Sequence, residues 1–418
     1  MRVGPLPSAS AVPVQSAGAV PVRLLMLNNE FPPLGGGTGT VNYALLVRLA
    51  QVPSLQIDLV TSALGKQAES EQFAERVRIL KVPVNNQNIH HSSNRELATY
   101  AARALPLALR LHRATPYDLC FAWSAVPAGG VALALRRLAG LRYIVRVSGP
   151  DIPGFEVRYA RLYPFLKPVV RAIWRGAETV VAKCEGEAQM IRVVDGRARI
   201  TCVPNGVDLG AFRRQEPVAE QGGVDANGPL RLLCVGRLIE RKGQQHLIEA
   251  VKRLSDQGIE LTLELVGTGD AASAYEAQVR QLGLEDRVHF AGYVPREQIA
   301  RHYTAAHVFV LPSYNEGMSV ATLEAMAAGL PVVVTRTGGT AELVEEGVNG
   351  FAFDWGDVDS LVGHLRRLAT DRGRVRAMGQ ASQARAASFT WEAATHSYQE
   401  LFAALIQTGA QQGREGSA

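Results

Sequence analysis

Short runs of apolar, often β-branched residues alternate with longer stretches of helical periodicity through the first half of the chain. The runs lack polar alternation, which predicts strands buried on both faces, as in a parallel sheet covered by helices on each side. The expected strands span 23–28, 56–61, 77–82, 118–122, 143–147, 179–182 and 200–203. Residues 23–207 are therefore expected to form one Rossmann-like α/β domain with right-handed crossovers.

A second series with the same rhythm follows a polar, Gly-rich segment at 216–228, which is expected to be a linker or surface loop. Its expected strands span 231–236, 261–267, 287–291, 307–312, 331–335 and 350–353. Residues 208–385 are thus expected to form a second Rossmann-like domain. Residues 386–418 are expected to form a C-terminal helix and a tail. The apolar stripe of that helix needs a partner surface, for which the first domain is one candidate.

The composition, with 47% hydrophobic and 20% charged residues, is typical of a globular protein. The net charge of +5 is spread along the chain and does not indicate nucleic acid. Residues 1–22 hold prolines and no signal-peptide pattern, so a disordered tail is expected. Without a run of about 18 apolar residues, a cytoplasmic location is expected, with any membrane contact peripheral. The four cysteines form no C-x-x-C pair and are expected to be reduced and structural.

A Gly-rich loop that includes Gly36 and Gly37 follows the first expected strand and precedes a helix expected to begin near Val41. Glycines let backbone amides approach a ligand, and a helix N-terminus favours phosphate or sugar oxygens. The alternative is a flexible turn. The loop matches neither G-x-G-x-x-G nor a Walker sequence, which disfavours nicotinamide and P-loop chemistry.

A basic loop, Gly236 to Gly243, follows the first strand of the second series and again precedes a helix. Its cations Arg237 and Lys242 would lie at the carboxyl end of a parallel strand, where open α/β sheets bind their ligands. Arginine grips phosphate oxygens bidentately and lysine adds a point charge, so the pair suits a diphosphate. Taken alone, the motif is better explained as an ordinary solvated basic loop, and only its context favours a phosphate site.

Two glutamates eight residues apart give the most specific signal, Glu316 and Glu324. Ser319 is expected to cap a helix, Gly329 to end it and Pro331 to open the next strand, which places Glu316 in a loop and Glu324 on the helix. Both carboxylates can then face one ligand and accept hydrogen bonds from sugar hydroxyls. The alternative is a capped helix with a charged face.

These motifs together resemble the retaining glycosyltransferases of family 4, which have the two-domain GT-B fold. The resemblance covers nearly all of residues 23–407, and its most specific part is the E-x7-E motif with its Gly-Leu-Pro-Val-Val ending. It is carried by the Gly-rich loop, Pro204 to Asp208, Arg237 to Gly243, Gly292 to Val294, and Glu316 with Glu324. It implies two Rossmann-like domains that face each other across a cleft.

The resemblance also implies a role for each matching residue. Arg237 and Lys242 would bind the donor diphosphate and, with Glu316 at the transferred sugar, carry catalysis, while Glu324 would bind the ribose. The remaining implied donor contacts are backbone amides of Gly317, Met318 and Ser319, the base-contacting Tyr293 and Val294, and Gly36 with Gly37 beside the phosphates. A nucleoside diphosphate sugar would be the co-substrate, with no metal and no other cofactor.

The chain departs from the family where many members have a histidine, because Ser148 stands there. Ser148 and Asp151 are the candidates for the acceptor side. Asp357 and Asp359 resemble a D-x-D metal motif, but they open a helical stretch, where acids serve as caps. The metal interpretation is therefore rejected.

Two other stretches invite functional interpretations. His90 and His91 have no carboxylate or cysteine partners at metal spacing, so a surface loop is expected. Residues 158–175 mix cations and aromatic residues, as a membrane-surface segment would, although a helix pair packed on the sheet with solvated arginines explains them somewhat better. Contact with the inner face of the membrane, and hence a lipid-linked acceptor, remains an alternative.

The expected function is transfer of a sugar from a nucleoside diphosphate sugar to an acceptor hydroxyl with retention, in bacterial glycan, lipid-linked saccharide or glycoconjugate synthesis. The acceptor can be a glycan, a lipid-linked saccharide or a small molecule. Two alternatives stay open. One is a sugar-nucleotide epimerase of the same architecture, and the other is a non-catalytic relative that binds the donor.

Overall fold

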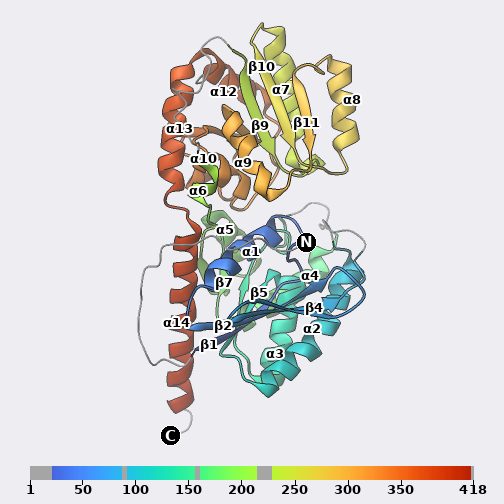
Figure 1. Ribbon diagram of the computed structural model, residues 1–418, viewed down its shortest axis with the longest axis vertical. Helices are drawn as coiled ribbons and strands as arrows, with labels where there is room; N and C mark the ends of the chain where they lie inside the picture. The colour runs from blue at the N-terminus through green and yellow to red at the C-terminus, as the bar shows by residue number, and fades with distance from the viewer. Residues whose placement is uncertain (1–20, 87–91, 156–160, 214–227, 416–418) are drawn as a thin grey trace.

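The computed structural model describes residues 21–86, 92–155, 161–213 and 228–415 and contains two α/β units, one above the other in Figure 1. Most of the tail expected over 1–22, most of the segment at 216–228, and both His90 and His91 lie outside the described residues. So does the beginning of the cationic and aromatic stretch, 158–160.

The first unit is built on an eight-stranded sheet of order β3-β4-β2-β1-β5-β6-β7-β8. Its strands are β1 (Val22–Leu27), β2 (Leu55–Ala63), β3 (Glu69–Ala74), β4 (Val77–Pro83), β5 (Leu119–Trp123), β6 (Tyr143–Arg146), β7 (Val180–Ala182) and β8 (Ile200–Cys202). All neighbours are parallel except β3, which is antiparallel to β4. The expected strands are all present, with ends shifted by no more than two residues.

Strand β3 was not predicted from the sequence. It lies at the sheet edge, its residues are half-buried or exposed, and four of its six residues are polar, so it lacks the apolar run of a buried strand. Cross-strand charge helps to hold it, because Lys81 of β4 pairs with both Glu69 and Glu71 at 3.4 and 3.0 Å. Edge strands of this polar kind resist pairing with other chains.

Helices cover both faces of the first sheet. They are α1 (Gly37–Leu49), α2 (Asn94–Ala114), α3 (Gly130–Ala139), α4 (Tyr163–Gly176) and α5 (Glu185–Val194), with a π-helical turn η1 (Ser124–Gly129) before α3. Helix α1 begins at Gly37 rather than near Val41, so the expected start was wrong. Gly39 reflects close packing inside the helix, since a Cβ there would stand 2.9 Å from the carbonyl oxygen of Leu34, whereas a Cβ on Gly37 would meet no atom within 4 Å.

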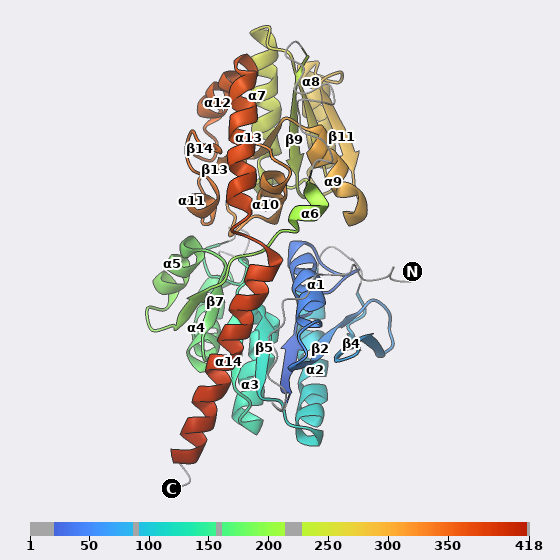
Figure 2. The same ribbon diagram turned by 60° about the vertical axis from the view of Figure 1, so that its left-hand side comes forward.

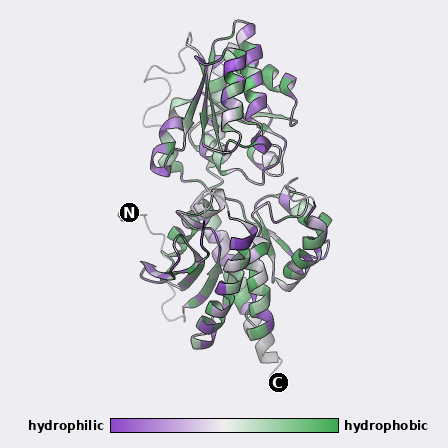
Figure 3. Cartoon of the chain, turned by 90° about the vertical axis from the view of Figure 1, so that its right-hand side faces the viewer, coloured by the Kyte–Doolittle hydropathy of each residue, from purple (hydrophilic) through white to green (hydrophobic). Residues whose placement is uncertain are grey.

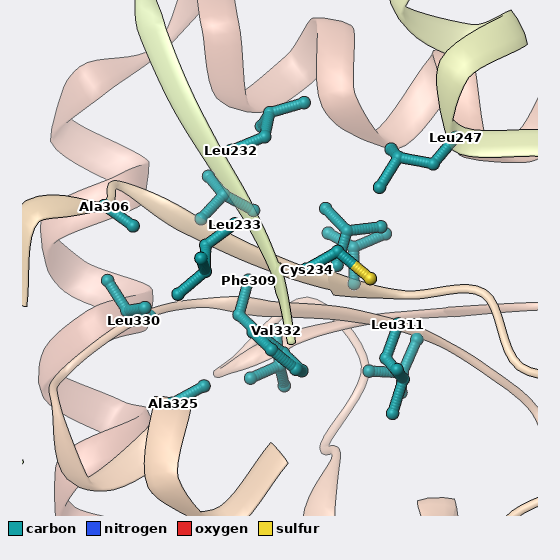
Figure 4. Close-up of a cluster of buried hydrophobic side chains, with 14 of the residues drawn as sticks. Leu232, Leu233, Cys234, Leu247, Ala306, Phe309, Leu311, Ala325, Leu330 and Val332 are labelled. Atoms are coloured by element: carbon teal, nitrogen blue, oxygen red, sulfur yellow. The ribbon is translucent and has the colours of Figure 1, made fainter. Parts of the chain in front are cut away.

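The second unit has a six-stranded parallel sheet of order β11-β10-β9-β12-β13-β14. Its strands are β9 (Leu230–Val235), β10 (Leu261–Val266), β11 (Val288–Gly292), β12 (Val308–Leu311), β13 (Val332–Thr335) and β14 (Gly350–Phe353). Its helices are α6 (Leu209–Phe212), α7 (Gln244–Asp256), α8 (Ala272–Leu282), α9 (Arg296–Ala305), α10 (Val320–Ala327), α11 (Thr340–Leu343), α12 (Val358–Thr370) and α13 (Arg372–Ala386), with a 3-10 turn η3 (Glu240–Lys242). Figure 4 shows its core, in which side chains of β9, β12 and β13 interdigitate with those of neighbouring helices.

The C-terminal helix α14 (Trp391–Glu415) leaves the second unit and runs along the first (Figure 2). Its Trp391, Tyr398 and Phe402 are buried in the same core as α1 and one face of the first sheet, while α2 to α5 cover the other face. Figure 3, coloured by hydropathy, shows apolar strands inside both units and polar residues on the outer helices, as expected for sheets covered by helices. Within the described residues, none of the helices combines the length and apolar character needed to cross a membrane.

Candidate active site

The candidate residues lie on loops that follow the carboxyl ends of parallel strands. The Gly-rich loop follows β1, Ser148 follows β6, Arg237 follows β9, Tyr293 follows β11 and Glu316 follows β12. Such ends meet at one edge of a sheet, where open α/β sheets bind ligands. Both sheets present this edge to the domain interface.

Hydrogen bonds join the two domains beside the loop that contains Glu316. Asn205 of the first domain donates to the Met318 carbonyl at 3.0 Å, and Asn315 donates to the Phe155 carbonyl, also at 3.0 Å. The backbone amide of Glu185 donates to the carboxylate of Glu342 at 2.7 Å. The loop that contains Glu316, which belongs to the second domain, is therefore hydrogen-bonded to the first domain as well.

Lys242 and Glu316 form an ion pair, and their side chains are largely buried. Burial opposes ionisation of Glu316, but Lys242 and then Arg241 prevail and hold its pKa below the usual range. Gly243 makes this pairing possible, because it has a φ of +70° and a Cβ there would stand 2.0 Å from the Pro312 carbonyl oxygen. The structure thus brings together a cation and an ionised carboxylate from two different loops.

Glu324 is buried on α10, one turn after Ser319, which caps the helix as expected by accepting the Thr322 amide at 3.2 Å. The Tyr303 hydroxyl donates to one carboxylate oxygen of Glu324 at 2.9 Å, and Arg296 donates to the other at 3.2 Å. Burial raises the pKa of Glu324 even though Arg296 opposes this shift. Its carboxylate is thus fixed in orientation before any ligand arrives.

The Gly-rich loop faces Arg237 across the domain interface. Gly36 and Gly37 are exposed, and a Cβ on either would meet no atom within 4 Å. Glu30 accepts the Gly36 amide, and burial raises the pKa of Glu30 while the nearby Arg237 lowers it. The open space beside the two glycines can therefore admit a ligand next to a guanidinium.

The remaining donor-side candidates lie on the second domain. Tyr293 is 66% exposed, and Val294 packs partly against the core. The Met318 side chain is buried, so only its backbone is available to a ligand, and Gly317 packs against the first domain.

The acceptor-side candidates have different surroundings. Asp151 accepts the backbone amides of Ser148 and Ala125 at 2.8 and 2.6 Å, and burial raises its pKa. One oxygen thus holds the loop that follows β6, and the other ties that loop to η1, which follows β5. The Ser148 hydroxyl is buried and has no hydrogen-bond partner in the described part of the chain.

The rejected metal motif behaves as a helix cap. Asp357 accepts the Ser360 amide at 3.0 Å at the start of α12, and Asp359 pairs with Arg253 at 2.6 Å. Among residues 21–86, 92–155, 161–213 and 228–415, no three His, Cys, Asp or Glu side chains gather as a metal site would require. The four cysteines are free, and three of them are buried.

Several residues that shape the site were not predicted from the sequence. Arg296 and Tyr303 both face Glu324 from α9, seven positions apart on one helix side, which was a readable signal. Glu30 lies at the start of the Gly-rich stretch, but no motif gives it a role. Lys183 and Glu187 belong to no recognisable sequence motif, because only the tertiary structure places them against Gly317.

Comparison with known proteins identifies matching families. A family model described as Glycosyltransferase Family 4 matches residues 35–211, and one described as Glycosyl transferases group 1 matches residues 220–385. A curated relative, the GDP-mannose-dependent alpha-(1-6)-phosphatidylinositol monomannoside mannosyltransferase of Mycolicibacterium smegmatis, is 27% identical over 374 residues, which cover 86% of this chain and 92% of the relative.

Solved structures show the same fold. Sucrose-phosphate synthase from Thermosynechococcus elongatus aligns with a TM-score of 0.81 and 23% identity over 93% of this chain and all of the other. Anabaena HepE in complex with UDP-glucose aligns with a TM-score of 0.72 and 21% identity over 91% of this chain and 99% of the other. Both domains therefore share the fold of known structures.

Proposed function

The chain belongs to glycosyltransferase family 4 and has the GT-B fold, and we propose that it transfers a hexose from a nucleoside diphosphate sugar to an acceptor hydroxyl with retention of anomeric configuration. The observation that carries the proposal is the pairing of Lys242 with Glu316 on a loop whose neighbouring residues Asn315 and Met318 are hydrogen-bonded to the first domain. A cation for phosphate and a carboxylate for sugar hydroxyls then lie side by side.

In the proposed reaction, the bond from the anomeric carbon to the diphosphate breaks and negative charge grows on the leaving group. Arg237 and Lys242 stabilise that charge, and because they are already in place, little reorganisation is needed. A diphosphate oxygen accepts the proton of the acceptor hydroxyl, so no enzymic base is required. The two cations supply the charge that a metal supplies elsewhere, so we expect transfer to survive chelation.

Glu316 and Glu324 are proposed to divide donor recognition between them. Glu316 accepts hydrogen bonds from the transferred sugar, and Glu324, fixed by Tyr303, accepts them from the ribose. Tyr293 and Val294 would contact the base, and amides of Gly317 and Ser319 the phosphates. The M. smegmatis relative is named for GDP-mannose and HepE is bound to UDP-glucose, so relatives differ in the base.

The test begins with the donor. Uridine, guanosine and adenosine diphosphate sugars are screened for an increase in melting temperature, which a ligand of the folded state must produce. With the donor found, Glu316→Ala and Lys242→Ala should each lower transfer by about a hundredfold or more, in line with removal of one transition-state contact. Lys252→Ala is the matched control, because Lys252 pairs with a carboxylate on an exposed helix face.

The outcomes separate the alternatives. Wild-type rates in both site variants would overturn the site assignment. Conversion of the donor to an isomer without any acceptor would indicate an epimerase, and donor binding without turnover would indicate a non-catalytic relative. Inversion of the anomeric configuration in the product, read by proton NMR, would overturn retention.

We also propose that the enzyme works at the inner face of the membrane on a lipid-linked acceptor. Helix α4 has a buried stripe and, on its opposite side, the exposed Phe165 and Val169, which continue from the exposed Leu162 just before the helix. Phe165 is 78% exposed. An exposed aromatic and aliphatic stripe flanked by cations is typical of membrane-surface helices.

A further inference from the structure

Glycines line the contact between α5 and two loops of the second domain. A Cβ on Gly186 would stand 2.4 Å from the Gly338 Cα, and a Cβ on Gly339 would stand 2.4 Å from the Gly317 carbonyl oxygen. None of these four glycines has a φ in the left-handed region. They are therefore required for close approach of the backbones rather than for a special conformation.

An ion pair of Lys183 and Glu187 lies inside this contact. The Lys183 ammonium is 2.5 Å from Oε1 of Glu187, and the two side chains are only 8% and 1% exposed. A Cβ on Gly317 would stand 2.1 Å from that same oxygen and 3.0 Å from Cε of Lys183. The pair thus packs directly on the backbone that follows Glu316.

The pair is rigidly anchored in the first domain. Lys183 donates its ammonium to the Val147 carbonyl at 3.1 Å, and its backbone amide donates to the second oxygen of Glu187 at 2.9 Å. In the described part of the chain, Lys183 is the only cation that pairs with Oε1 of Glu187. The oxygen that faces Gly317 therefore cannot turn away without losing its partner.

Stability does not explain such a pair. The cost of taking two charges out of water often equals or exceeds their attraction, and buried ion pairs are best explained where they fix one arrangement among several. Here the ion pair can fix how closely the two domains pack, because Gly317 belongs to the second domain and both charged residues belong to the first.

We propose that Lys183 and Glu187 are positioning residues that set the backbone of Gly317 for the donor diphosphate, and that they can do so only while Gly186 and Gly338 are in contact. Donor affinity is then coupled to domain closure through this contact. The inference rests on the proposed function, since it assumes that the loop after Glu316 binds the donor.

The first experiment blocks the contact without touching the donor loop. Gly186→Ala places a methyl group against the Gly338 backbone, but alanine is a better helix former than glycine, so α5 itself should not suffer. We expect the donor dissociation constant to rise about ten- to a hundredfold, the usual size of coupling between sites, in protein that remains folded at the assay temperature. Gly363→Ala is the control, because that helical glycine of α12 has open space around its Cβ position.

The second experiment removes the charges. Lys183→Met and Glu187→Gln each leave one buried charge unpaired, so each should weaken donor binding more than the double variant does. Asp195→Asn is the matched control, since Asp195 is a buried carboxylate at the far end of α5 that pairs with Arg175 at 2.7 Å. It should lower the melting temperature and leave the donor dissociation constant unchanged.

Calorimetric titration with UDP-glucose, GDP-mannose and ADP-glucose distinguishes the outcomes. If the wild type binds one of them and Gly186→Ala, Lys183→Met and Glu187→Gln bind it equally well, the positioning role is wrong while the proposed function stands. If the pair variants lose affinity only in proportion to a loss of folded protein, the role is structural and the inference is wrong. If the wild type binds none, both fail together.

Discussion

Two carboxylates of one motif behave differently at the scale of single residues. Glu316 and Glu324 are both enclosed by the second domain, yet the pKa of Glu316 is lowered and that of Glu324 is raised. The difference lies in the partners. A buried ammonium faces Glu316, whereas Glu324 has a neutral hydroxyl and a guanidinium that is 43% exposed and therefore screened by water.

The opposite shifts predict opposite effects on stability. A raised pKa means that ionising Glu324 costs folding free energy as pH rises through its folded pKa, so Glu324→Gln should unfold at a higher denaturant concentration than wild type at pH 7.5. Glu316→Gln removes an ionised group with a lowered pKa and leaves Lys242 unpaired, so it should lose about 2 kcal/mol or more at that pH. Urea unfolding at several pH values measures both.

The pH dependence provides the internal check. The difference in the free energy of unfolding between Glu324→Gln and wild type should shrink as pH falls through the raised pKa of Glu324. The lower free energy of unfolding of Glu316→Gln should persist to lower pH. It should match that of wild type only when Glu316 of the wild type becomes protonated. Equal and pH-independent effects of the two variants would contradict the proposed electrostatic difference, and we expect both variants to lose transfer activity.

How much of the site was predictable follows from how local each signal is. Lys242 and Glu316 were identified because each lies in a short motif after a strand, and parallel strand ends must converge. The ion pair of Lys183 and Glu187 could not be predicted, because its meaning arises only when Gly317 of another domain packs against it. The contacts of Asp151 with the backbone amides of Ser148 and Ala125 could not be predicted from the sequence either.

At the scale of elements, apolar runs predicted the buried strands and failed for β3. A strand with one neighbour and little burial needs no apolar run, so its pairing with β4 depends on Lys81 and on backbone hydrogen bonds. Helix α14 shows the reverse case. Its apolar stripe was readable, but its partner was not, and the structure seats it on α1 and β5 through Tyr398 and Phe402.

The packing of α14 predicts a large cost for removing its first aromatic residue. Trp391 is 2% exposed and contributes to the core between α1 and the first sheet. Trp391→Ala should therefore lower the free energy of unfolding by about 3–5 kcal/mol, as for other buried tryptophans. Glu400→Ala is the control on the exposed side of the same helix, and equal urea midpoints for the two variants would show that α14 is not part of the core.

At the scale of the whole molecule, the apolar stripe of α4 lies next to the acceptor side of the site. The Tyr163 hydroxyl, at the start of α4, donates to the Pro150 carbonyl at 3.1 Å, one residue before Asp151. The same loop reaches the donor side, since the Phe155 carbonyl accepts Asn315. A lipid-linked hydroxyl arriving along α4 would thus meet the domain interface without leaving the membrane surface.

This placement predicts binding to anionic vesicles through α4. Full burial of a phenylalanine side chain contributes about 1.5–3 kcal/mol, so Phe165→Glu should weaken partitioning onto phosphatidylglycerol vesicles at least tenfold, measured by sedimentation. Val348→Glu is the matched control, because Val348 is 47% exposed but lies on the second domain. Donor affinity should stay unchanged in both variants, since neither side chain is among the donor contacts. Equal sedimentation of wild type and Phe165→Glu, or none of either, would contradict a membrane-facing α4 and favour an acceptor that diffuses in water.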